Sequence, residues 1–96
     1  MQTLSQIKSQ LELFKPKLAQ KYPIKDLAIF GSYARGEANE KSDLDLMVEF
    51  SKPVGYQFFE LAQDLENYLH IKVDLVSKNG IKPAYFESLK GDLIHV

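Results

Sequence analysis

The stretch GSYARGEANEKSDLDLMVEF, residues 31–50, places two aspartates in an apolar run that otherwise has the composition of a buried strand. Side chains at positions i and i+2 of a strand point to the same face, so Asp43 and Asp45 are expected to lie side by side. The opposite face of this strand would carry Leu44, Leu46 and Val48. Adjacent carboxylates repel each other, and such a pair needs either a compensating charge or hydration.

Two interpretations of the aspartate pair are open. One face of an antiparallel sheet is often hydrated, and an isolated D-x-D is more often such a face than a functional site. A third carboxylate, Asp74, also interrupts a short apolar strand, in the sequence VDLV. Alone, Asp74 is more typical of a solvent-facing strand residue. If the two strands are neighbours, however, the three carboxylates converge and suit a hard cation such as Mg²⁺, which binds carboxylates together with phosphate oxygens.

The beginning of the same stretch has features that suit phosphate binding. Gly31 and Ser32 directly follow a predicted strand, where a glycine lets the backbone approach a ligand and a hydroxyl can bind phosphate, although Gly-Ser is also an ordinary turn. Arg35 is the only arginine in the chain. Its planar guanidinium is equally suited to phosphate and to a neighbouring acid such as Glu37. Gly36 is expected to serve a turn.

The spacing of apolar residues predicts the surrounding elements. Two amphipathic helices are predicted, one carrying Leu4, Ile7, Leu11, Phe14 and Leu18 and the other Phe58, Leu61, Ala62, Leu65 and Leu69. Pro16 predicts a break or kink in the first helix near Lys15. Strands are expected at residues 26–30, 44–50 and 72–77, with a helical turn and loop at 32–41, a helical segment at 83–89 and a short closing strand in LIHV. This mixture predicts a layered α+β or α/β fold.

Composition excludes several classes of protein. The chain has 96 residues, a net charge of −1 and no cysteine. The length predicts one domain over residues 1–96. A net charge near zero argues against a long nucleic acid as partner, and the lack of cysteine excludes disulfides and thiolate metal sites and fits a cytoplasmic location. Neither a signal peptide nor a membrane span is expected, because no apolar run is long enough.

Taken together, Gly31-Ser32, Arg35-Gly36 and Ser42-Asp43-Leu44-Asp45 form the pattern G-S-x2-R-G-x5-S-D-x-D. This pattern closely resembles the signature of minimal nucleotidyltransferases in the DNA polymerase beta-like nucleotidyltransferase superfamily. The resemblance implies an α+β fold, with a small mixed sheet flanked by helices. It also implies transfer of a nucleoside monophosphate from a nucleoside triphosphate to an acceptor, with release of pyrophosphate.

The resemblance also implies roles for individual residues. Asp43, Asp45 and Asp74 would be catalytic and would bind two Mg²⁺ ions, with Asp74 assisting deprotonation of the acceptor hydroxyl. The residues expected to bind the donor nucleotide, ATP, are Gly31, Ser32, Arg35 and Ser42, and Arg35 is counted among the catalytic residues as well. On this interpretation, the bound metal and nucleotide offset the repulsion between the aspartates.

Minimal members of this family resemble antitoxins that are encoded with a HEPN-domain ribonuclease toxin, and some are implied to transfer AMP to a tyrosine of that toxin. The first hypothesis is therefore a protein adenylyltransferase acting on a partner protein. The second is a non-catalytic module that neutralises the toxin by contact. A third, a small-molecule nucleotidyltransferase, is disfavoured because no separate acceptor domain is present in these residues.

The remaining polar and aromatic residues indicate less. His70 and His95 are expected at the surface or at a sheet edge, because neither lies near a nucleophile in the sequence. Six aromatic residues are expected mostly in the core, with some available to a partner: Tyr56, Phe58, Phe59, Tyr68, Tyr85 and Phe86.

Overall fold

The computed structural model describes residues 2–96. Its elements run in the order α1 (Leu4–Lys21), β1 (Ile24–Phe30), α2 (Gly31–Ala34), β2 (Leu44–Phe50), α3 (Gln57–Leu69), β3 (Val73–Ser77), η1 (Lys78–Gly80), α4 (Pro83–Leu89), η2 (Lys90–Asp92) and β4 (Ile94–His95). The four strands form one sheet in the order β3-β2-β1-β4. β1 is antiparallel to both β2 and β4, whereas β2 and β3 are parallel. The predicted α+β fold with a mixed sheet is confirmed.

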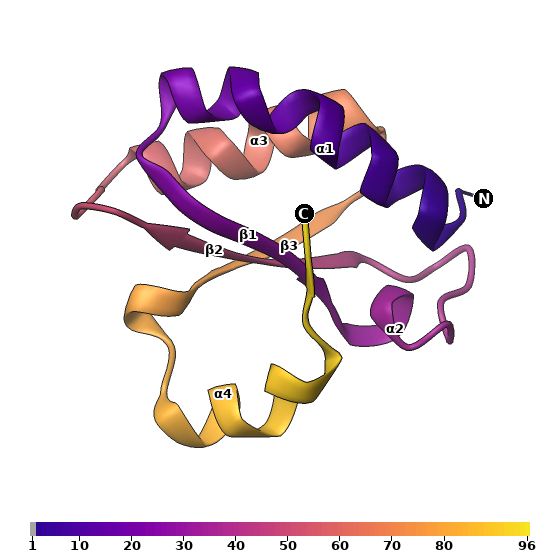
Figure 1. Ribbon diagram of the computed structural model, residues 1–96. Coiled ribbons are helices and arrows are strands. Elements are labelled where there is room, and N and C mark those ends of the chain that lie inside the picture. Colours follow the sequence, from indigo (N-terminus) through magenta and orange to yellow (C-terminus); the bar gives the residue numbers. More distant parts are fainter. Residues whose placement is uncertain (1) are drawn as a thin grey trace.

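The two long helices lie together on one face of the sheet, and α4 lies on the other (Figure 1). The first face forms the main core, because the alternation in β2 directs Leu44, Leu46 and Val48 toward the helices, where each is fully buried. The helices contribute the residues that their periodicity predicts, namely Ile7, Leu11 and Leu18 from α1 and Leu61, Leu65 and Leu69 from α3.

The opposite face of the sheet is covered over only part of its length. Met47 of β2 packs there with Phe30 of β1 and Leu89 of α4, and all three are buried. Asp45 lies two residues before Met47 on the same face and remains partly exposed. This face of β2 is therefore apolar and covered by α4 in the middle of the strand. It is open at the end where β2 begins.

Helix α1 continues through Pro16, so the break that the sequence offers near Lys15, as an alternative to a kink, does not occur. Proline removes one backbone hydrogen bond and usually costs a helix about 3 kcal/mol. Pro16 lies on the exposed side of α1, where water can hydrogen bond the carbonyl left without a donor. Leu11 and Leu18 are buried on either side of it, and their packing holds both parts of the helix on the sheet.

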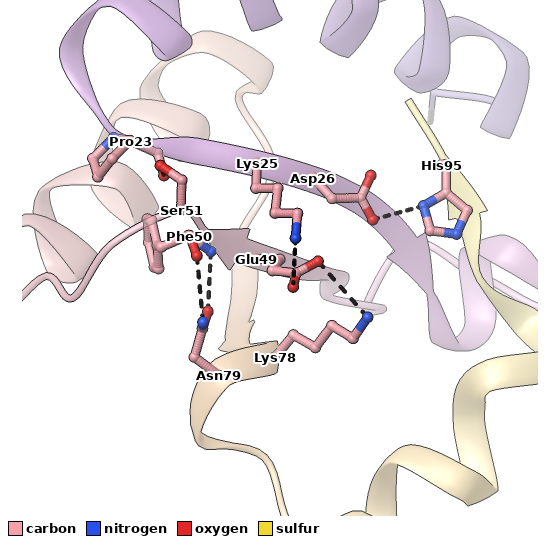
Figure 2. A network of polar contacts seen from close by, with 9 residues as sticks. All are labelled: Pro23, Lys25, Asp26, Glu49, Phe50, Ser51, Lys78, Asn79 and His95. Atoms are coloured by element: carbon pink, nitrogen blue, oxygen red, sulfur yellow. Dashed lines mark hydrogen bonds and ion pairs between the residues drawn. The ribbon is translucent and has the colours of Figure 1, made fainter.

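The end of the sheet where β1 begins and β2 ends is held by a network of polar contacts (Figure 2). The Asn79 side-chain oxygen accepts a hydrogen bond from the backbone N–H of Phe50 at 3.0 Å, and its amide nitrogen donates to the Phe50 carbonyl at 3.3 Å. Glu49 lies between two lysines, with ion-pair distances of 3.9 Å to Lys25 and 3.7 Å to Lys78. The contacts of Asn79 and Lys78 connect the segment after β3 to β2, and the contact of Lys25 connects β1 to β2.

The C-terminal strand β4 closes the sheet beside β1. His95 is aligned with Ala28, and its Nδ1 lies 2.8 Å from the Asp26 carboxylate (Figure 2). The histidine is therefore an exposed residue on an edge strand, as predicted. No helix among residues 2–96 has the length and apolar character that crossing a membrane requires.

Candidate functional site

Three segments meet at the end of the sheet opposite the network of Figure 2. β1 ends at Phe30, and β2 and β3 both begin there. Asp45 is aligned with Phe30 across the antiparallel pair and with Asp74 across the parallel pair. Aligned residues on neighbouring strands lie about 5 Å apart and share a face, so Asp45 and Asp74 are direct neighbours. Asp43 lies just before β2 and is exposed.

The neighbouring carboxylates perturb Asp45 strongly. The pKa of Asp45 is raised from its ordinary value of 3.8 to about 6, mainly by burial and in addition by the negative charges of Asp74 and Asp43. The positive charge of Arg35 opposes this rise in pKa. In the free protein the charged form of Asp45 is therefore less stable than that of an ordinary aspartate, although it still predominates at neutral pH. A bound cation would favour it, because an opposite charge nearby stabilises a carboxylate.

The donor set fits Mg²⁺, although the free protein has no preformed metal cage. Within residues 2–96, no three acidic or histidine side chains are grouped closely enough to hold a metal ion by themselves. Mg²⁺ usually binds one or two carboxylates and completes its shell with water and substrate phosphates. The aligned pair of Asp45 and Asp74 could supply these two carboxylate ligands. A cation bound there would also offset the repulsion of Asp45 by Asp74 and Asp43, which contributes to the raised pKa of Asp45.

Gly31 lies in contact with the Asp45 carboxylate. A Cβ atom built on Gly31 would stand 2.0 Å from Asp45 Oδ2, which is far inside van der Waals contact. The φ angle of Gly31 is also positive, at 74°, a conformation that disfavours any residue with a side chain. Only glycine therefore fits at this position, and the backbone that begins α2 passes directly over the central aspartate.

The loop between α2 and β2 is shaped by its own polar groups. The Ser42 hydroxyl accepts a hydrogen bond from the Asn39 backbone N–H at 2.9 Å, and the Glu37 N–H donates to the Ser32 carbonyl at 2.8 Å. Gly36 has a φ of 74° with open space around it, so it serves a turn, as predicted. Ser42 therefore has a structural role in the loop, and its predicted contact with the nucleotide stays a prediction.

Arg35 binds two acids in the free protein. Its Nε lies 3.2 Å from Glu37 Oε1, which is the loop contact that the sequence left open as an alternative to phosphate binding. Its Nη1 lies 3.3 Å from Asp92 Oδ2 in η2, a partner 57 residues away in the chain. Sequence reasoning did not find Asp92, because a lone acid after a short helix carries no local signal. The Arg35 side chain keeps 44% of its surface exposed and stays accessible to a ligand.

A polar hollow of about 620 Å³ opens beside Asp43. It lies between the start of α1, the loop before β2 and the connection from α3 to β3. Its lining includes Gln2, Tyr33, Lys41, Ser42, His70 and Lys72. His70 is exposed, as predicted, and ends α3 in the left-handed conformation with a φ of 57°. Of the three carboxylates, Asp43 lines this hollow, whereas Asp45 and Asp74 do not.

Three of the six aromatic residues expected mostly in the core are exposed, and these belong to the part of the set that was expected to be available to a partner. Tyr56, which precedes α3, Phe59 in α3 and Tyr85 in α4 expose 78%, 68% and 49% of their surface. The other three, Phe58, Tyr68 and Phe86, are partly buried against the two cores. Exposed aromatic side chains are typical of surfaces that bind another protein.

Two known proteins are similar to this sequence over its full length. A protein of Methanocaldococcus jannaschii, named as a candidate protein adenylyltransferase, is 51% identical over 98 residues, which cover 100% of both chains. The protein adenylyltransferase MntA of Thermococcus cleftensis is 37% identical over 97 residues, covering 100% of this chain and 98% of its own.

Solved structures share the fold. A candidate minimal nucleotidyltransferase has a TM-score of 0.82 at 33% identity, covering 97% of this chain and 95% of its own. A toxin–antitoxin complex with AMP-PNP has a TM-score of 0.65 at 28% identity, covering 77% and 62% of the two chains. The complex of a tri-AMPylated HEPN toxin with its MNT antitoxin, from Shewanella oneidensis, has a TM-score of 0.70 at 21% identity, covering 93% and 70%. Residues 11–94 match the nucleotidyltransferase domain, and the chain belongs to that family as one of its minimal members.

Proposed function

We propose that this protein transfers AMP from ATP to a hydroxyl group of a partner protein, and that the acceptor is a tyrosine of a HEPN-type toxin. The observation that carries the proposal is the contact of Gly31 with Asp45, beside the aligned pair of Asp45 and Asp74. It brings the phosphate-binding and metal-binding parts of the family pattern to one end of the sheet. The names of the full-length relatives support a protein as acceptor.

Each residue has a defined task in this reaction. Asp43, Asp45 and Asp74 would hold two Mg²⁺ ions, which when bound stabilise charge on the attacking and leaving oxygens of an in-line displacement. Gly31 and Ser32 bind the terminal phosphates through the backbone and the hydroxyl, and Arg35 adds charged hydrogen bonds to the same phosphates. Phosphoryl transfer depends mostly on positioning and charge stabilisation, which these residues supply together.

The transfer itself is a single displacement. The acceptor oxygen forms a bond to the α-phosphorus of ATP, and the bond from that phosphorus to the bridging oxygen of the pyrophosphate breaks. Asp74, on the edge strand of the sheet, takes the proton of the acceptor hydroxyl. Pyrophosphate leaves as the second product, and Arg35 would offset part of its negative charge. A tyrosine is a suitable acceptor, because its phenol loses a proton more readily than an aliphatic hydroxyl does.

Two features of the surface support a protein as the second substrate. The hollow beside Asp43 is open to solvent, so a side chain of another protein can enter it. Tyr56 and Phe59 at the start of α3 offer exposed aromatic area to a partner. A docked toxin would complete the acceptor side of the site.

The second candidate is an antitoxin that neutralises the toxin by contact alone. The exposed aromatic residues favour it equally, because they suit binding whether or not a reaction follows. The two candidates differ in their need for Asp43, which a purely binding module could lose without effect.

The intact mass of the proposed HEPN-type toxin partner separates the two candidates. After incubation with this protein, ATP and Mg²⁺, we expect the toxin to gain the mass of one or more AMP groups and to lose ribonuclease activity. Asp43→Asn should abolish the gain, whereas the matched control Asp26→Asn, at the far end of β1, should retain it. An unmodified toxin that is tightly bound and inactive would establish the binding module instead.

A further inference from the structure

The Arg35 guanidinium is held by two acids that come from different parts of the chain and that bind two different nitrogens. Nε donates to Glu37 in the loop after α2, at 3.2 Å, and Nη1 donates to Asp92 in η2, at 3.3 Å. A single carboxylate would leave the guanidinium free to swing about one hydrogen bond. Two carboxylates on different nitrogens fix both its plane and its direction.

This arrangement leaves most of the hydrogen-bonding capacity of Arg35 free. A guanidinium carries five N–H donors, and these two contacts use one on Nε and one on Nη1. Within residues 2–96, Nη2 makes no hydrogen bond, so both of its N–H groups are available to a ligand. With 44% of the side chain exposed, a ligand can reach them.

The fixed guanidinium belongs to the region of the carboxylate cluster. The backbone N–H of Arg35 donates to the Gly31 carbonyl at 3.1 Å, so the arginine follows directly on the glycine that contacts Asp45. Arg35 therefore acts on the same small volume as the metal-binding pair.

We propose that Asp92 and Glu37 are positioning residues that hold the Arg35 guanidinium with Nη2 free to bind the terminal phosphates of the nucleotide. The inference rests on the proposed function, since it requires a nucleoside triphosphate at this site. It makes the C-terminal segment, through η2, a part of the donor site. An exposed ion pair contributes little to stability, so the benefit lies in an arginine that is already ordered when the nucleotide arrives.

The proposal can be tested by NMR on the whole protein, because a chain with one arginine gives one Nε–H signal in the arginine region of a ¹H–¹⁵N spectrum. In Asp92→Asn we expect this signal to shift and to show faster side-chain motion. The dissociation constant of Mg–AMP-PNP should rise about two- to fivefold, the range that an exposed charged pair provides. Asp92→Asn should also raise KM for ATP by the same factor and leave kcat unchanged. The matched control Glu87→Gln, which removes a surface pair with Lys90 in the same segment, should change none of these quantities.

Tighter binding of Mg–AMP-PNP by Asp92→Asn would overturn the proposal, because Asp92 would then compete with the phosphates for Arg35. An unchanged Nε–H signal and unchanged affinity would overturn it as well. If the wild-type protein itself did not bind Mg–AMP-PNP, the proposed function would fail and this inference with it. If the wild type bound and Asp92→Asn bound equally well, only the inference would fail.

Discussion

Replacing Asp45 by asparagine should stabilise the metal-free protein, although it removes a residue that we assign to the reaction. Burial and the charges of Asp74 and Asp43 raise the pKa of Asp45 to about 6, so the folded protein is destabilised whenever this carboxylate is charged. Asparagine has nearly the same shape and carries no charge. The substitution should therefore increase the free energy of unfolding at neutral pH in the presence of a chelator.

The size of this effect follows from the pKa. A rise from 3.8 to about 6 corresponds to about 3 kcal/mol, and the partial exposure of Asp45 reduces it through solvent screening to about 1–2 kcal/mol. The sign with pH is also fixed. Because the pKa of Asp45 is raised in the folded state, its contribution to the free energy of unfolding is most favourable below pH 3.8. This contribution is lost as pH rises through about 6. The advantage of Asp45→Asn should be absent at low pH and complete above pH 7.

The difference in free energy of unfolding between the wild type and Asp45→Asn can be measured by urea unfolding, followed by circular dichroism in the presence of a chelator at pH 4.5 and 7.5. We expect the midpoint of Asp45→Asn to rise by about 0.5–1 M at pH 7.5. Asp64→Asn is the matched comparison with the opposite sign. The hydrogen bond from Tyr22, at 2.6 Å, lowers the pKa of Asp64, and Lys21 acts in the same direction from 2.9 Å. Asp64→Asn should therefore destabilise the protein at pH 7.5. If Asp45→Asn were neutral or destabilising there, the account of the carboxylate cluster would be refuted.

Three further substitutions test separate parts of the structure. Gly31→Ala should lower the free energy of unfolding by about 1–2 kcal/mol and abolish transfer, because the new Cβ displaces Asp45; a fully active variant would contradict the contact. Arg35→Lys should lower kcat/KM for ATP by about tenfold or more, because lysine keeps the charge but loses the fork; wild-type kinetics would show that only the charge matters. Asn79→Ala should cost about 1–2 kcal/mol in urea unfolding, because it frees two backbone groups of β2, whereas the exposed control Asn67→Ala should cost much less.

Local periodicity was sufficient to predict most of the fold. The strand at residues 44–50 and the helix at 83–89 have the bounds that the sequence predicts. Their patterns are short, but each is bounded by a glycine, proline or polar cluster. The break that Pro16 offers as an alternative to a kink does not occur, because the propensity of a residue is only a local property. The packing of Leu11 and Leu18 against the sheet depends on the whole fold, and it outweighs the helix-breaking effect of the proline.

The candidate site was only partly readable for the same reason. The pattern from Gly31 to Asp45 lies in one continuous stretch, so spacing alone could reveal it. The alignment of Asp74 with Asp45 depends on the parallel pairing of β2 with β3. The whole of α3 separates these strands in the chain, so no local pattern predicts the pairing. The contact of Asp92 with Arg35 depends on how the C-terminal segment folds back, and no local pattern indicates it.

The attachment of Asn79 to β2 also bears on how this protein ages. An asparagine followed by glycine is prone to deamidation, because the unhindered backbone nitrogen of the glycine attacks the side-chain amide, and Gly80 follows Asn79. The product carboxylate could no longer donate to the Phe50 carbonyl and would place a negative charge against it. In the folded protein both polar atoms of the Asn79 side chain are engaged, which restrains the amide from turning toward Gly80. Chemical ageing at this pair should therefore follow the opening of η1 from the sheet, and damage there would loosen α4 while leaving the aspartates at the other end of the sheet in place.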